Sequence, residues 1–220
     1  MKLTAKPKKT LTNLAYDAIR TAICDGSLPP GTPLSENDLS RQMGMSRTPV
    51  REALRILESQ DFVEIRDGLA TFVKTLSEWE VRDLFEIRKE LEVLAASTAL
   101  NYITEQEICA MEEEFKKFLH LRKTGSNIDY AEFASVDSKL HVFIVDHCQN
   151  KYVKKFMRSI MDDIQRCQLM SASCLGDLEE STTQHLEILD LLKKKDLESL
   201  SQKLRDHVDW SLKCVLYRGN

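Results

Sequence analysis

The pattern of hydrophobic and polar positions predicts three helices in the first 60 residues. Two of them begin at Ser35 and Ser46, serines that can cap a helix, and are expected to reach Met43 and about residue 60. The first helix covers residues 12–24, and its hydrophobic stripe is formed by Leu14, Ala18, Ile19, Ala22 and Ile23. The proline-rich run 28–33 is expected to be an irregular loop.

After these helices the pattern changes to short runs that are typical of β-strands. Residues 62–65 and 70–73 are separated by Asp67-Gly68, a pair that is typical of tight hairpin turns. Three helices followed by a hairpin predict a winged helix-turn-helix over residues 1–75.

The remaining residues, 76–220, are predicted to form an all-α bundle of six to seven helices, so the fold class is mainly α. Capping-box patterns begin at Ser77 and Thr104, each with a glutamate three residues later. The helices are expected at residues 78–101, 105–122, 130–147, 152–172, 178–194 and 197–216.

Charge separates the two predicted domains. Residues 1–76 contain 11 Lys and Arg against 9 Asp and Glu, whereas the other residues contain 20 against 26. A mildly basic head on an acidic body fits a DNA-contacting part joined to a part with another role. The chain has no glycine-rich nucleotide-binding motif, no apolar stretch of the roughly 20 residues that span a membrane, and no C-x-x-C pair. A cytoplasmic protein without membrane contact is expected.

The predicted third helix has the two faces that a DNA-reading helix needs. The apolar face is formed by Val50, Ala53, Leu54 and Leu57. A neighbouring basic face is formed by Arg47, Thr48, Arg51 and Arg55. Arginine can pair with guanine in the major groove, and Thr48 with the first amides of the helix suits a phosphate. On an isolated helix, such a face would more often be ordinary solvated surface. The preceding helix, the turn and the hairpin favour DNA recognition.

This region resembles the GntR family of bacterial regulators. The resemblance rests on Leu28-Pro29-Pro30-Gly31, Leu34-Ser35-Glu36, Leu39 and the stretch 44–54. It implies base contacts from Arg47 and Arg51, backbone or base-edge contacts from Ser46 and Thr48, and entry of the wing around Gly68 into the minor groove. The chain departs from the family at Asn37, where some members have a phosphate-binding arginine, and in the wing, which has only one basic residue, Arg66.

Four polar residues of the second predicted domain lie on apolar helix faces. Asp137 and His141 are one helical turn apart, His185 shares a stripe with Ile188, Leu189 and Leu192, and His207 shares one with Leu200, Leu204 and Cys214. Burying four such groups separately would be costly, so we expect them to converge on a divalent metal ion such as Zn²⁺, Ni²⁺ or Mn²⁺. The alternative is that each is a separate core residue with its own hydrogen bond.

Two other histidines are not expected to join this site. His147 projects about 240° around the helix from His141, at about 100° per residue. His120 lies in a charged helix end and is expected at the surface.

From residue 77 to about 216, the chain resembles the FCD-type effector domain of one GntR subfamily. In that pattern an Asp-x-x-x-His pair and two later histidines bind a metal, and Asp137, His141, His185 and His207 match it in order. The length is closer to the VanR-like branch than to the FadR-like one. FadR-like members that bind acyl-CoA lack the metal set, so a fatty-acyl ligand is not expected. Zn²⁺ is the first choice of metal.

Arg88 lies in register with Leu84, Leu91 and Ala95 on an otherwise apolar stripe. It could extend to water or pair with a nearby glutamate. The FCD resemblance implies instead that it faces the ligand cavity, where the guanidinium and the metal would each take one oxygen of a small carboxylate. The sequence leaves both interpretations open.

Together these features predict a ligand-responsive transcription regulator without enzymatic activity, with a repressor preferred over an activator. A homodimer would place two recognition helices on a palindromic DNA operator. One alternative is a metal-dependent enzyme fused to a DNA-binding head, but no H-E-x-x-H or similar motif supplies a general base. A second alternative is a regulator whose metal is purely structural. The sequence identifies neither the effector nor the operator.

Overall fold

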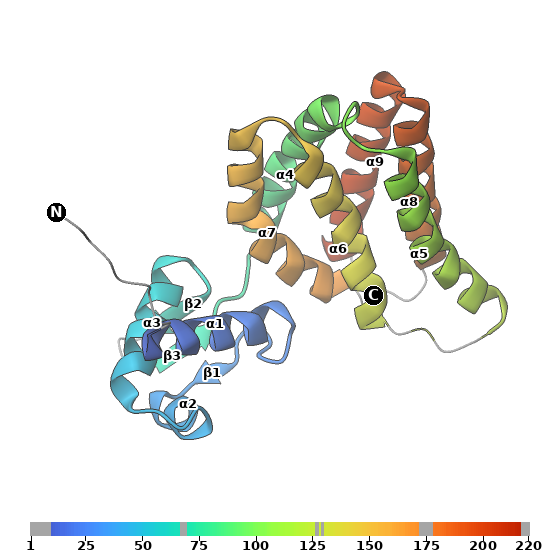
Figure 1. Ribbon diagram of the computed structural model, residues 1–220. Coiled ribbons are helices and arrows are strands. Elements are labelled where there is room, and N and C mark those ends of the chain that lie inside the picture. The colour runs from blue at the N-terminus through green and yellow to red at the C-terminus, as the bar shows by residue number, and fades with distance from the viewer. Residues whose placement is uncertain (1–9, 67–69, 126–127, 129, 172–177, 217–220) are drawn as a thin grey trace. The chain divides into compact units, whose positions relative to one another are not determined.

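The chain divides into two units, residues 1–76 and residues 77–220 (Figure 1). The computed structural model describes residues 10–66, 70–125, 128, 130–171 and 178–216. Within these ranges no helix has the length and apolar character that a membrane crossing requires.

The first unit contains three helices and a small antiparallel sheet. The helices are α1 (Leu11–Cys24), α2 (Glu36–Gln42) and α3 (Arg47–Ser59). The strands are β1 (Pro33–Leu34), β2 (Val63–Arg66) and β3 (Ala70–Val73), in the order β1-β3-β2. Helix α3 packs against α1, α2 and β2, and it buries the predicted apolar face of Val50, Ala53, Leu54 and Leu57. The predicted winged helix-turn-helix is confirmed, and this core fixes the orientation of the neighbouring, basic face of α3.

Two details of this unit differ from the sequence-based expectation. Pro33, in the run expected to be irregular, begins β1 and lies opposite Phe72 of β3. A proline is tolerated there because β1 is an edge strand and needs no amide hydrogen on its outer side. In α1 the buried stripe is rotated by one residue: Ala15, Ile19 and Ile23 are buried, whereas Leu14 is 45% exposed and Ala18 is exposed.

The turn between α2 and α3 is built from local signals. Ser35 caps α2 by accepting a hydrogen bond from the amide of Asp38. Gly44 follows α2 with a positive φ of 63°, a conformation that favours glycine and reverses the chain towards α3. Ser46 is the N-cap residue of α3, but its side chain makes no capping hydrogen bond. Its hydroxyl is therefore left for another partner.

The described part of the second unit is helical throughout, as predicted. Its helices are α4 (Glu78–Ala99), α5 (Glu105–Lys123), α6 (Tyr130–His147), α7 (Lys151–Ser171), α8 (Leu178–Lys194) and α9 (Leu197–Leu216). Both predicted capping boxes are present, at Ser77 with Glu80 and at Thr104 with Glu107.

Helix α4 is the first helix of this bundle. It packs against α6, α7 and α9, while α8 packs against α5 and α9. The core contains Phe115, Leu140, Ile144, Leu189 and Leu204, among other buried side chains. The inward faces of α4, α6, α8 and α9 therefore meet around the same interior, which is where the polar residues of the candidate site lie.

Candidate functional site

The four predicted metal ligands lie together inside the second unit. Asp137 and His141 come from α6, His185 from α8 and His207 from α9. One potential ligand atom from each side chain lies within 4.8 Å of those of the other three. The imidazole centroids are 4.5 Å apart for His185 and His207 and 5.2 Å apart for His141 and His207. All three histidines are buried and Asp137 is half-buried, so the helices form an interior polar cluster.

Three buried polar atoms in and beside this cluster have no hydrogen-bond partner within the described residues. They are Nε2 of His141, Nε2 of His185 and Nη1 of Arg88. Nε2 of His185 lies 3.2 Å from Oδ1 of Asp137, within ion-pair distance but without the geometry of a hydrogen bond. Leaving a buried polar atom unpaired costs about 1–3 kcal/mol. A divalent cation would satisfy both imidazole nitrogens and the carboxylate oxygen at once.

Glu92 of α4, which the sequence analysis did not single out, contacts two members of this region. Its Oε2 lies 2.7 Å from Nδ1 of His141, and its Oε1 accepts a hydrogen bond from Nε of Arg88 at 2.7 Å. Burial acts to raise the pKa of Glu92, but the charges and hydrogen bonds of His141 and Arg88 outweigh burial and lower the pKa to about 2. An ionised carboxylate can only accept, so Nδ1 of His141 carries a proton.

Gln184 of α8 holds His207 in the tautomer that is protonated on Nδ1, as Glu92 does for His141. The Oε1 atom of Gln184 lies 3.0 Å from Nδ1 of His207, while its Nε2 donates to Oε1 of Glu180 at 3.2 Å. The bond to Glu180 sets which end of the amide is nitrogen, so the oxygen faces the imidazole. Nδ1 of His207 is therefore the donor, and its Nε2 is left with the lone pair.

Asp137 and His185 also have neighbouring polar side chains that can orient them. Gln168 of α7 donates from Nε2 to Oδ2 of Asp137 at 2.6 Å, and Ser138 donates to the oxygen of the same amide at 2.8 Å. Oδ2 of Asp137 is thereby occupied, and Oδ1 faces His185. Ser181 lies 3.5 Å from Nδ1 of His185, at the limit of a hydrogen bond. Such partners orient the ligands of protein metal sites.

Two histidines of the cluster, His185 and His207, favour the neutral form. Burial lowers the pKa of His185 to about 4, although Asp137 acts in the opposite direction. Burial, followed by the charges of His185 and His141, also lowers the pKa of His207 well below its usual value. Neutral imidazole is the form that ligates a metal, so these two side chains need not lose a proton at neutral pH to do so.

Arg88 does not extend to water, because it is only 1% exposed. It pairs with Glu92 through Nε, one of the two partners that the sequence analysis considered, and its guanidinium carbon lies 5.3 Å from the ring centroid of Phe85. Its Nη1 is still unpartnered within the described residues. The guanidinium can therefore bind an anion without giving up the contact with Glu92.

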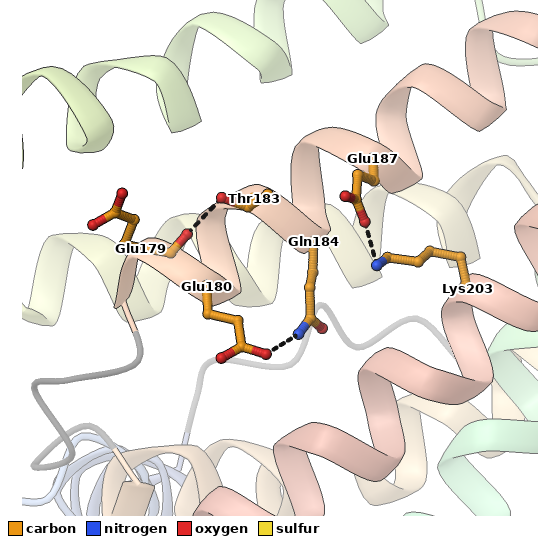
Figure 2. Close-up of a pocket in the computed structure, with 6 residues that line it drawn as sticks. All are labelled: Glu179, Glu180, Thr183, Gln184, Glu187 and Lys203. Carbon is orange, nitrogen blue, oxygen red and sulfur yellow. Dashed lines mark hydrogen bonds and ion pairs between the residues drawn. The ribbon is translucent and has the colours of Figure 1, made fainter.

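A shallow groove on α8 and α9 lies beside the cluster (Figure 2). Its lining residues are Glu179, Glu180, Thr183, Gln184, Glu187 and Lys203. In Figure 2, Lys203 of α9 pairs with Glu187 of α8, and Gln184 points towards Glu180. Gln184 links this groove to the buried His207, since its amide contacts both.

His147 and His120 are not part of the cluster. Nδ1 of His147 bonds to the carbonyl of Phe143 at 2.8 Å, and its Nε2 lies 3.2 Å from Glu107. His120 is exposed near the end of α5. Both histidines are thus suitable controls for experiments on the cluster.

The predicted DNA-contacting residues lie at the start of α3. Ser46, Arg47, Thr48 and Arg51 are all exposed there. Arg51 forms a two-pronged ion pair with Glu36 of α2, through Nε at 2.9 Å and Nη2 at 2.7 Å, which the sequence analysis did not anticipate. These two bonds leave the Nη1 side of the guanidinium for another acceptor. Gly68, predicted at the tip of the wing, lies outside the described residues.

A helix-turn-helix with a β-hairpin, joined to a separate helical unit, is the architecture of a DNA-binding transcription regulator. Residues 11–73 match the bacterial regulatory proteins of the gntR family, and residues 83–209 match the FCD domain. The chain belongs to the GntR family and carries a C-terminal FCD domain, as the resemblance predicted. Its relatives in this family are transcription regulators and not enzymes.

Similar proteins support this assignment along nearly the whole chain. The uncharacterized HTH-type transcriptional regulator YdhC of Bacillus subtilis is 27% identical over 210 residues, covering 93% of this chain and 92% of that protein. The HTH-type transcriptional repressor RspR of Escherichia coli is 26% identical over 203 residues, covering 92% and 87%. A crystal structure of a putative GntR regulator from Rhodococcus sp. RHA1 shares the fold, with a TM-score of 0.78 at 19% identity and coverage of 95% and 99%.

Proposed function

We propose that the FCD domain of this regulator binds one divalent metal ion through Asp137, His141, His185 and His207. The observation that carries the proposal is the convergence of four ligand atoms within 4.8 Å, two of them buried imidazole nitrogens without a partner in the described structure. Ligand atoms about 2.0–2.1 Å from a common ion lie at most about 4 Å apart, so only small movements would be needed. Three imidazoles and one carboxylate suit Zn²⁺ first, and also Ni²⁺ or Mn²⁺.

The second part of the proposal is that the effector is a small carboxylic acid held by the metal and Arg88. Nη1 of Arg88 is a buried donor without a partner among the described residues, and a carboxylate oxygen is the acceptor that a guanidinium binds most strongly. Arg88 and His141 contact the two oxygens of the same carboxylate, Glu92, so the guanidinium is one residue away from the cluster. One oxygen of the acid would bind Arg88, and the other would take an open position on the metal.

The winged helix-turn-helix is proposed to read the operator with α3 in the major groove. Arg47 and Arg51 would contact bases, while Ser46 and Thr48 would contact phosphates or base edges. Because the related RspR is named a repressor, repression is the preferred outcome. The wing at Gly68 would enter the minor groove.

A homodimer is proposed because two recognition helices are needed for a palindromic operator. The FCD domain offers exposed apolar side chains on two helices that pack together, Ile87 and Leu94 on α4 and Tyr152 and Phe156 on α7. Contiguous apolar surface is typical of subunit interfaces, so we propose that these side chains form the contact between the two subunits. Binding of the acid would shift the dimer between arrangements that differ in operator affinity.

Elemental analysis of the purified protein tests the metal proposal. We expect about one divalent ion per chain in the wild-type protein and in the His120→Ala and His147→Ala controls. His185→Ala and His207→Ala should each lose the ion. If His147→Ala removes the metal while His185→Ala retains it, the ligand assignment is wrong.

The alternative of a purely structural metal is tested separately. Small carboxylic acids are added to metal-saturated protein, and the melting temperature is measured. The unpartnered Nη1 of Arg88 favours a shift with at least one acid. Absence of any shift across a broad panel of acids would favour the structural metal.

A further inference from the structure

We propose that Glu92 is a positioning residue of the metal centre, which fixes His141 in the tautomer that presents Nε2 to the ion. This inference rests on the proposed metal function. The residue belongs to α4, a helix that contributes none of the four proposed ligands. Its role would be to act through His141 and not to touch the metal.

The contacts of Glu92 are specific and fully buried. Glu92 is 1% exposed, and its two oxygens are used by different partners, Oε1 by Arg88 and Oε2 by His141, each at 2.7 Å. Because Glu92 is buried, its carboxylate depends on these two donors for its hydrogen bonds. A carboxylate in this position accepts a hydrogen bond from Nδ1, so a neutral His141 has its only lone pair on Nε2. That nitrogen is the one without a partner in the described structure.

The hydrogen bond between Nδ1 of His141 and Glu92 affects how strongly His141 can bind a metal. A carboxylate that accepts from the outer nitrogen of a histidine fixes the ring orientation and raises the basicity of the ligating nitrogen. Removing such a partner typically lowers metal affinity about 10–100-fold. Arg88 balances the charge of Glu92, so the carboxylate can remain ionised in an apolar interior.

A simple role in stability would have a different signature. A residue that only fills the core would affect the melting temperature but not the protonated nitrogen of His141. A positioning residue affects the tautomer of the metal-free protein and the metal affinity together. The tautomer is observable by ¹⁵N NMR of the imidazole without any metal or effector.

The experiment compares Glu92→Gln with Glu90→Gln in the full-length protein. Glu90 is two residues away on α4, is exposed and pairs with Arg205, so its substitution is a matched control. Glutamine has the size of glutamate, but an NH2 group that cannot accept replaces one oxygen, so one of the two donors, which bind different oxygens of Glu92, loses its acceptor. We expect Glu92→Gln to bind Zn²⁺ about 10–100-fold more weakly in competition with a chromophoric chelator, and Glu90→Gln to bind it as the wild-type protein does.

The NMR measurement separates the possible failures. In metal-free wild-type protein we expect the Nδ1-protonated tautomer of His141, and in Glu92→Gln a shift towards the Nε2-protonated one. If Glu92→Gln does not fold, the double variant Arg88→Met/Glu92→Met removes both charges and the acceptor of His141 together, and it should show the same loss of affinity. Wild-type affinity and tautomer in a folded variant would overturn the role of Glu92. If the wild-type protein binds no metal, the proposed function fails, whatever the tautomer.

Discussion

Removal of the metal should lower the thermal stability of the FCD domain by an amount that can be calculated. A ligand that binds only the folded state at 100 times its dissociation constant contributes about 2.7 kcal/mol to the free energy of unfolding. The four ligand atoms come from three different helices, so the site should not survive unfolding. The metal is therefore expected to bind the folded domain alone.

The free energy converts into a melting temperature through the entropy of unfolding. For a domain of about 140 residues, an unfolding entropy of about 2.1 cal/mol/K per residue gives about 0.3 kcal/mol/K. A loss of about 2.7 kcal/mol then lowers the melting temperature by about 9 °C. The assay is thermal unfolding, followed by circular dichroism, of protein with Zn²⁺ at 100 times its dissociation constant and of the same protein with excess chelator.

Variants show whether this shift comes from the cluster. His147→Ala, on the same helix as His141 but outside the cluster, should keep the full shift of about 9 °C. His185→Ala should melt at the same temperature with and without Zn²⁺. An equal metal-dependent shift in His185→Ala and the wild-type protein would refute the reasoning, because the stabilising ion would then bind elsewhere.

Three further predictions concern DNA and the effector. Arg47→Ala and Arg51→Ala should each weaken specific operator binding by roughly 1–3 kcal/mol in gel-shift titrations at fixed salt, and unchanged affinity in both would remove the assignment of α3. Glu36→Gln should lower the ratio of specific to non-specific DNA affinity, because Arg51 loses one of the two hydrogen bonds that hold it and the surface loses a negative charge; an unchanged ratio would mean that the ion pair has no part in recognition. Arg88→Lys keeps a cation beside Glu92 but lacks the second donor nitrogen, so calorimetry should show normal Zn²⁺ binding and at least about tenfold weaker binding of an acid that stabilises the wild-type protein. If Arg88→Lys and the wild-type protein bind the acid with equal affinity, Arg88 has only a structural role.

Local sequence signals accounted for most of the fold. The serine and threonine caps of α2, α4 and α5, the helical periodicity and the change of period before the hairpin are properties of short segments. Such signals act between residues that are three or four positions apart, so a single sequence contains them in full. The placement of polar residues on apolar stripes likewise predicted that Asp137, His141, His185 and His207 turn inwards.

Where a local signal was ambiguous, tertiary packing decided. The stripe of α1 could have been centred on Leu14 or on Ala15, and contact with α3 selected the face with Ala15, Ile19 and Ile23. The two-residue strand at Pro33 has no periodicity of its own and exists only because β3 lies beside it.

The outer partners of the cluster depended on the tertiary structure for the same reason. Glu92 is 49 residues from His141, and Gln168 is 31 residues from Asp137. The sequence contained one usable signal, since Glu92 follows Arg88 by one helical turn and lies on the same buried face of α4. Which atom of His141 or Asp137 each of these groups reaches depends on how α4, α6 and α7 pack, and packing fixes distances that no spacing along the chain determines.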